Sequence, residues 1–221
     1  MIKACIFDLD GTLMDTVASI ARPINKTLEF FGLQPRPVEE YNFYAGDGMD
    51  TAVRRALAAA GDPEGIHAKE GIPLCRKWFG EDPLYQVKPY AHMKDVLDEL
   101  KNRGIKITVF SNKPHEAAID VVNTIFGKGY FDWIQGQTDL IPKKPDPSGA
   151  IQIMKILQVS KEECLYFGDT NTDMKTGIGA GICTVGVTWG FRPRKELEEN
   201  HADRIIDSPM DIIRLVEEYS R

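Results

Sequence analysis

The stretch Ala4-Cys5-Ile6-Phe7-Asp8-Leu9-Asp10-Gly11-Thr12-Leu13 joins a short apolar run to two closely spaced carboxylates. The apolar run predicts a buried strand over Ala4–Phe7, because near-continuous apolar residues suit strands that are covered on both faces. Residues i and i+2 of a strand share a face, so Asp8 and Asp10 are expected to project together from its carboxyl end. Gly11 allows the chain to leave the strand sharply. Taken alone, however, the pattern also fits an ordinary polar loop.

From about residue 90 onward, apolar runs of strand length alternate with amphipathic stretches. This alternation predicts an α/β fold built on a doubly wound, Rossmann-like parallel sheet. Further strands are expected at Lys106–Phe110, Trp133–Gly136, Cys164–Phe167, Cys183–Val187 and Arg204–Ile206. The intervening helices are expected at Met93–Arg103, His115–Phe126, Ser148–Leu157, Asp173–Ala180 and Met210–Glu218.

Residues 15–87 have a different pattern, with helical periodicity and no convincing strand. Helices are expected at Ile20–Phe31, Thr51–Ala60 and Gly65–Phe79. This predicts a small helical domain, residues 15–87, inserted into an α/β core domain formed by residues 1–14 and 88–221. The hinges are expected near Met14–Thr16 and Tyr85–Lys88.

The overall charge argues against some partners. The 221 residues carry a formal net charge of -6, whereas nucleic-acid and anionic-membrane surfaces need an excess of Lys and Arg. The four cysteines are widely spaced and form no CxxC motif, which favours buried, reduced thiols. No stretch approaches the ~18 apolar residues of a membrane helix. We therefore expect a cytoplasmic protein with no nucleic-acid or membrane partner.

A second acidic pair follows the strand expected at Cys164–Phe167. It lies in Gly168-Asp169-Thr170-Asn171-Thr172-Asp173, where Asp173 alone could simply be a helix N-cap. Ligands collect at the carboxyl ends of strands in open α/β sheets, so Asp8, Asp10, Asp169 and Asp173 could converge there. Their mutual repulsion would call for a cation. A site with oxygen ligands only and room for water suits Mg²⁺.

Two further segments offer groups that could bind phosphate. Ser111 and Asn112 follow the strand expected at Lys106–Phe110, and their side chains and N–H groups can bind phosphate oxygens. Lys144 precedes a predicted helix and could neutralise phosphate and carboxylate charge together. Taken alone, the Ser111-Asn112 segment is more typical of a polar turn, and the Lys144 segment of a solvated pair of charges. The two acidic pairs, Ser111-Asn112 and Lys144 each lie at the end of a predicted strand or the start of a predicted helix. The occurrence of all four segments together favours a shared site.

Together these motifs resemble those of the haloacid dehalogenase-like superfamily. Asp8-Leu9-Asp10-Gly11-Thr12-Leu13 is similar to its first motif, Ser111 to its second, Lys144 to its third, and Gly168-Asp169 with Asp173 to its fourth. The resemblance covers essentially the whole chain. It implies that the helical insertion is the cap domain found between the first two motifs.

The resemblance implies a role for each core residue. Asp8 would be the nucleophile that forms an aspartyl-phosphate, and Asp10 the general acid and base. Ser111 and Lys144 would bind the transferring phosphoryl group, with Asn112 in the same phosphate site and Thr12 supporting the loop and the substrate. The set that would hold Mg²⁺ consists of Asp8, the backbone carbonyl of Asp10, Asp169 and, indirectly, Asp173. Halide release needs no proton, so the presence of Asp10 favours phosphoryl chemistry over dehalogenation.

Within the superfamily, the chain most resembles the phosphoglycolate phosphatases. The supporting residues are Ser111-Asn112-Lys113-Pro114, the segment Ala45-Gly46-Asp47-Gly48, and Arg54-Arg55-Ala56-Leu57. Gly46, Asp47 and Gly48 are expected to line the substrate pocket, unless they form only a flexible linker. Arg54 and Arg55 could reach a substrate carboxylate or be solvated. The expected partner is a small phosphorylated metabolite, and the protein is expected to be a monomer or a homodimer.

Three other functions remain open at the level of the sequence. A phosphosugar mutase similar to β-phosphoglucomutase uses the same four motifs, but its turnover would depend on a bisphosphate. A pyrophosphatase or nucleotidase would be separated by a substrate panel. A non-catalytic module that binds a phosphorylated ligand is disfavoured, because such a protein would be free to lose these motif residues.

Overall fold

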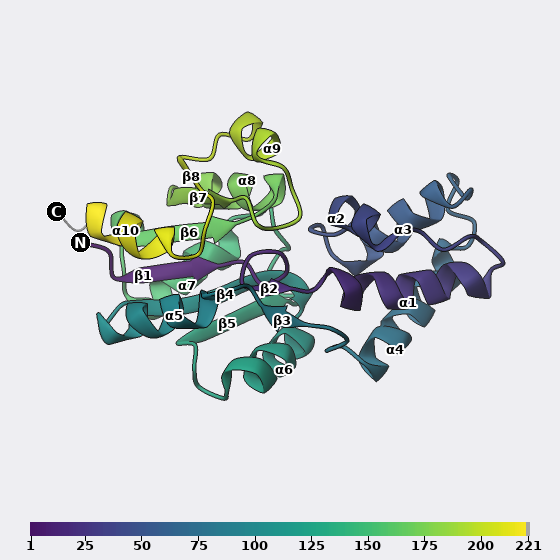
Figure 1. Cartoon of the computed structure of the whole chain (residues 1–221), viewed down its shortest axis with the longest axis horizontal. Coiled ribbons are helices and arrows are strands. Elements are labelled where there is room, and N and C mark those ends of the chain that lie inside the picture. The colour runs from purple at the N-terminus through teal and green to yellow at the C-terminus, as the bar shows by residue number, and fades with distance from the viewer. Residues whose placement is uncertain (220–221) are drawn as a thin grey trace. The chain divides into compact units, whose positions relative to one another are not determined.

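A computed structural model describes residues 1–219 of the chain (Figure 1). The chain forms two compact units. One contains Met1–Asp15 together with the chain from Pro89 onward, and the other contains Thr16–Lys88. No helix in the described part of the chain is both long and apolar enough to cross a membrane.

The larger unit is built on a parallel sheet with the strand order β5-β4-β1-β6-β7-β8. Its strands are β1 (Ala4–Phe7), β4 (Lys106–Pro114), β5 (Trp133–Gln137), β6 (Cys164–Gly168), β7 (Cys183–Val187) and β8 (Arg204–Ile206). Strand β1 lies between β4 and β6, and the strand order reverses there. The carboxyl ends of these three strands therefore meet at a topological switch point, where ligands bind in such sheets. The predicted fold class is confirmed.

Helices cover both faces of this sheet (Figure 1). They are α5 (Met93–Asn102), α6 (His115–Phe126), α7 (Ser148–Leu157), α8 (Asn171–Ala180), α9 (Arg194–Glu199) and α10 (Asp211–Glu218). Ala150 and Ile153 of α7 pack in one buried cluster with Ala4 and Ile6 of β1. Helices α5 and α10 contact each other on the opposite side of the sheet (Figure 1). Every residue of β1 is fully buried between these layers, which explains its unbroken apolar sequence.

The smaller unit is helical. It contains α1 (Val17–Phe30), a 3₁₀ turn at Val38–Glu40, α2 (Tyr41–Tyr44), α3 (Met49–Ala59) and α4 (Ala68–Glu81). Helix α1 packs against α3 and α4, and its buried side chains include Ile24 and Leu28. The 3₁₀ turn and α2 were not predicted, because segments of three or four residues are too short to show a periodicity.

Helix α9, the connection between the units and the end of β4 also differ from the sequence-based expectation. The chain passes between the units through β2 (Met14–Asp15) and β3 (Lys88–Pro89), two unpredicted strands that pair with each other. Strand β4 was expected to end at Phe110, but it continues to Pro114 with a register shift against β5. The irregular pairing lets polar residues continue the strand past its apolar run. Ser111, Asn112 and Lys113 are therefore buried within the strand.

Candidate functional site

The nucleophile expected in the sequence lies directly after β1. The N–H of Asp8 donates to the carbonyl of Phe167 on β6 at 2.9 Å, so the backbone of Asp8 continues the strand pairing. The chain then turns at Gly11, whose φ is 88°. A Cβ atom on Gly11 would lie only 2.2 Å from Oδ2 of Asp169, so the close approach of these two loops requires glycine.

Lys144 joins two of the expected carboxylates. Its Nζ lies 2.7 Å from Oδ1 of Asp8 and 2.7 Å from Oδ1 of Asp173, and all three side chains are nearly or fully buried. Burial alone would disfavour the ammonium, but the charges of Asp173 and Asp8 hold the pKa of Lys144 well above its usual value. Lys144 is therefore a fixed positive charge beside Asp8.

Asn112 fixes the main chain that carries Lys144. Its side-chain amide donates to the carbonyl oxygen of Lys144 at 3.1 Å and accepts from the N–H of Lys144 at 2.8 Å. This pair of hydrogen bonds ties β4 to the loop before α7. Ser111, expected to bind phosphate, lies beside Asn112 and accepts a hydrogen bond from the N–H of Lys113 at 3.1 Å.

Asp173 is held from several directions. Its Oδ2 accepts hydrogen bonds from the N–H and hydroxyl of Thr170 at 3.1 and 2.7 Å, which forms a capping box at the start of α8. Tyr166 donates to Oδ1, the same atom that faces Lys144. The N-cap of α8 is thus Thr170, and Asp173 is the third residue of the helix rather than its cap. These contacts fit Asp173 as the residue that orients Lys144.

Asp169 completes a cluster of carboxylates at the sheet edge. Oxygen atoms of Asp8, Asp169 and Asp173 lie within 4.8 Å of one another, and all three residues are buried. Burial and the charge of Asp173 raise the pKa of Asp169 to about 7. Burial, followed by the charge of Asp173, also raises the pKa of Asp8, although Lys144 opposes this effect. Three buried carboxylates around one ammonium form an oxygen-rich site with excess negative charge, which fits the expected Mg²⁺.

The loop after β7 supports Asp169 and was missed in the sequence. The N–H of Phe191 donates to Oδ2 of Asp169 at 2.7 Å, while the hydroxyl of Thr12 donates to Oδ1 at 3.0 Å. The Trp189 indole donates to the carbonyl of Thr12 at 2.9 Å. A Cβ on Gly190 would lie 2.4 Å from Cβ of Asp169, so this loop also requires glycine. The position of Trp189-Gly190 just beyond an apolar strand was the available signal, because the carboxyl ends of parallel strands share one edge.

Asp10 has a partner that the sequence did not reveal. The ammonium of Lys113 lies 2.9 Å from Oδ1 and 3.1 Å from Oδ2 of Asp10. The side chain of Lys113 is 5% exposed and that of Asp10 is 17% exposed. A second lysine, at the end of β4, is therefore part of the site.

The predicted substrate loop lies in the smaller unit. Gly46 and Gly48 have φ values of 105° and 89°, a conformation that favours glycine. Arg55 of α3 binds this loop through Oδ2 of Asp47 at 2.5 Å and the carbonyl of Tyr44 at 3.0 Å. Arg55 therefore contacts the loop of its own unit. The expectation that Gly46, Asp47 and Gly48 line the substrate pocket remains a prediction, as does a substrate contact of Thr12.

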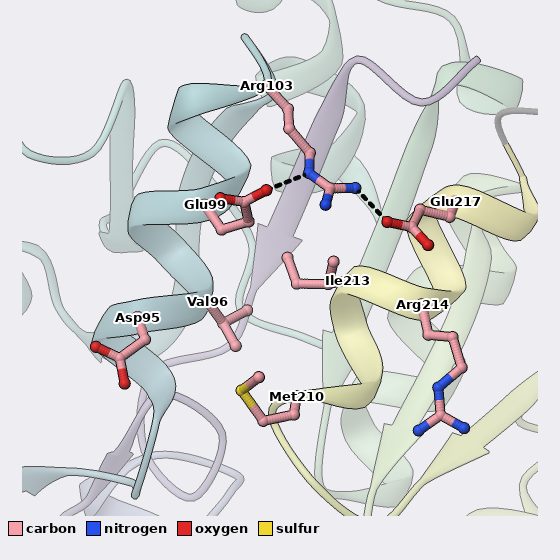
Figure 2. Close-up of a pocket in the computed structure, with 8 residues that line it drawn as sticks. All are labelled: Asp95, Val96, Glu99, Arg103, Met210, Ile213, Arg214 and Glu217. Atoms are coloured by element: carbon pink, nitrogen blue, oxygen red, sulfur yellow. Dashed lines mark hydrogen bonds and ion pairs between the residues drawn. The ribbon is translucent and has the colours of Figure 1, made fainter.

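A separate hollow of about 460 Å³ lies between α5 and α10 (Figure 2). Val96, Met210 and Ile213 line its floor, and at one end Arg103 bridges Glu99 and Glu217 at 2.7 and 2.8 Å. None of the predicted site residues lines this hollow. It is therefore distinct from the carboxylate cluster.

Residues 5–187 match the family of haloacid dehalogenase-like hydrolases. The chain belongs to this family. It is 30% identical to the phosphoglycolate phosphatase of Aquifex aeolicus over 98% of each chain. It is also 28% identical to phosphoglycolate phosphatase 1 of Pseudomonas aeruginosa, over 96% of this chain and 78% of that protein. The predicted superfamily and the resemblance to this subgroup are confirmed.

Solved structures support the same assignment. A Lactobacillus delbrueckii subsp. bulgaricus protein, proposed to be a phosphoglycolate phosphatase, shares 29% identity with a TM-score of 0.89. That similarity covers 95% of this chain and 96% of the other. A haloacid dehalogenase-like family protein from Streptococcus pneumoniae, 22% identical, has the same fold, with a TM-score of 0.86 over 97% and 98% of the two chains.

Proposed function

We propose that this protein is a Mg²⁺-dependent phosphatase that hydrolyses a small phosphate monoester through Asp8, with 2-phosphoglycolate as the best candidate. The observation that carries the proposal is the position of Asp8. Its carboxylate lies beside the fixed ammonium of Lys144 and within a cluster of carboxylates suited to a metal ion. The names of its relatives support the choice of substrate.

In the first step, an oxygen of Asp8 attacks phosphorus and the bond from phosphorus to the ester oxygen breaks. Asp10 gives its proton to the departing alkoxide, which leaves as the alcohol. The phosphoryl group is now bonded to Asp8. Lys144, joined by the hydroxyl of Ser111, binds the phosphoryl oxygens and stabilises the charge that they carry in the transition state.

In the second step, Asp10 removes a proton from a water molecule, whose oxygen attacks the phosphorus. The bond from Asp8 to phosphorus breaks, which releases inorganic phosphate and restores both carboxyl groups. Mg²⁺, held by Asp8, Asp169 and the backbone carbonyl of Asp10 with Asp173 in support, would neutralise phosphoryl charge when bound. Asp169 is kept in place for this role by Thr12 and the N–H of Phe191.

The test is release of inorganic phosphate from a panel of small phosphate esters that includes 2-phosphoglycolate, with Mg²⁺ or with EDTA. We expect Mg²⁺-dependent release by the unaltered protein and none by Asp8→Asn, because the amide is a poor nucleophile. Asp95→Asn is the matched control, since the Asp95 side chain is 77% exposed and lies on α5. Full activity of Asp8→Asn, or no hydrolysis of any ester, would contradict the proposal.

A further inference from the structure

Lys113 is a charged residue of the site to which the proposed reaction assigns no role. Its ammonium contacts both oxygens of Asp10, at 2.9 and 3.1 Å, from the end of a different strand. The lysine side chain is 5% exposed, so its charge is largely removed from water. A buried ammonium is costly unless an anion compensates it, and Asp10 supplies such an anion in the structure.

The position of Asp10 determines what Lys113 would meet in a complex. If Asp10 protonates the departing oxygen, that oxygen must lie within about 3 Å of its carboxyl group. Because the ammonium of Lys113 lies 2.9 Å from the same group, it is within about 6 Å of the departing oxygen. A carboxylate attached through one carbon atom to that oxygen spans most of this distance.

The two lysines of the site therefore face different parts of the reaction. Lys144 contacts Asp8 and Asp173 and stands where the phosphoryl group is transferred. Lys113 contacts Asp10, which protonates the departing alkoxide. Once Asp10 has given its proton to the departing oxygen, it is a carboxylate that repels an anionic leaving group, and an ammonium beside it offsets this repulsion. A neutral leaving group would not be repelled by Asp10 and would gain nothing from this ammonium.

We propose that Lys113 selects the substrate by binding a carboxylate on the leaving group, close to the ester oxygen. This inference rests on the proposed phosphatase function and narrows its substrates to phosphate esters of short hydroxy acids. The ammonium of Lys113 binds Asp10 in the absence of substrate and bridges Asp10 and the substrate carboxylate in the complex. Its compact charge on a flexible stem suits this exchange of partners.

The test compares 2-phosphoglycolate with the phosphate ester of glycolamide, in which a neutral amide replaces the carboxylate. The quantity measured is the ratio of the two kcat/KM values, for the unaltered protein, Lys113→Met and Lys113→Arg. A lost hydrogen bond to a charged group lowers this ratio by about 10- to 100-fold in Lys113→Met. Lys113→Arg retains the positive charge, so we expect it to keep part of the preference. Lys155→Met, at an exposed position on α7, should leave the ratio unchanged.

The possible outcomes separate the inference from the phosphatase function. If the unaltered protein hydrolyses both esters equally well, or if Lys113→Met lowers both values by the same factor, the inference is wrong while the phosphatase stands. If neither ester is hydrolysed in the presence of Mg²⁺, the phosphatase function fails, and the inference fails with it. Circular dichroism checks that each variant folds. Should Lys113→Met not fold, Lys113→Gln takes its place with the same ratio as the readout.

Discussion

The carboxylate site and the loop of the smaller unit are held together by different kinds of contact. At the sheet edge, Lys144, Asp8 and Asp173 form a buried network in which each charge has a nearby partner. In the helical unit, Arg55 holds Asp47 through an ion pair whose side chains are 38% and 26% exposed. Buried charges depend on their partners for stability, whereas exposed pairs contribute little. The reacting groups are thus fixed by buried ion pairs, while the Gly46–Gly48 loop is held by a partly exposed one.

The largest effect is expected from Lys144→Met. This change leaves the carboxylates of Asp8 and Asp173 without their shared cation, and breaking a buried ion pair costs about 3–5 kcal/mol. We expect the free energy of unfolding, measured in urea with EDTA present, to fall by this amount and phosphate release to disappear. Lys175→Met, at an exposed position of α8, is the control. An unchanged unfolding free energy would mean that the network contributes nothing to stability.

A pH dependence should follow from the cluster itself. The pKa of Asp169 is raised to about 7 in the folded protein, so its protonated form stabilises the fold. This stabilisation is fully present below about pH 4 and is lost as the pH rises through 7. Without metal, each such carboxyl lowers the unfolding free energy by up to about 1.4 kcal/mol per pH unit in this range. Bound Mg²⁺ favours the charged form, so the increase in Tm on adding Mg²⁺ should be larger at pH 8 than at pH 5. NaCl at matched ionic strength is the control, and an equal increase at both values would contradict this expectation.

A smaller effect is expected from Gly190→Ala. The added Cβ would lie 2.3 Å from the carbonyl oxygen of Gly11 and 2.4 Å from Cβ of Asp169, and such overpacking costs about 1–3 kcal/mol. We expect lower stability in urea and weaker Mg²⁺ binding by calorimetry, because Asp169 is displaced. Gly80→Ala, on α4 of the smaller unit, meets no atom within 4 Å and should stabilise the protein by about 0.5–1 kcal/mol. A similar response of both variants would refute the close contact at Gly190.

The smallest change in stability is expected from Arg55→Ala. Removing a partly exposed ion pair costs about 0–1 kcal/mol, so Tm should hardly move. If the Gly46–Gly48 loop meets the substrate, its release should raise KM more than it lowers kcat. Arg54→Ala, at an exposed neighbouring position, is the control. A loss of stability as large as that of Lys144→Met would remove the contrast between the two regions.

The sequence by itself determined the parallel α/β fold and the central members of the site. Apolar runs predicted the strands, and Lys144 was expected to join the site from its position just before a predicted helix. The carboxylates after two strands predicted that Asp8, Asp169 and Asp173 would lie together. This inference needs no side-chain geometry, because the carboxyl ends of parallel strands share one edge of the sheet. The four residues do meet there.

Only the tertiary structure decided which side chains pair. Lys113 meets Asp10 across 103 positions of the chain, and Trp189 meets Thr12 across 177. The amide of Asn112 hydrogen-bonds the backbone of Lys144, a contact that the sequence did not indicate, while its phosphate contact stays a prediction. Local patterns cannot predict such contacts, since they depend on the register of neighbouring strands and on the register shift between β4 and β5. A hydrogen bond requires a donor–acceptor distance that is correct to a fraction of an ångström, and such distances are set only when the whole sheet is assembled.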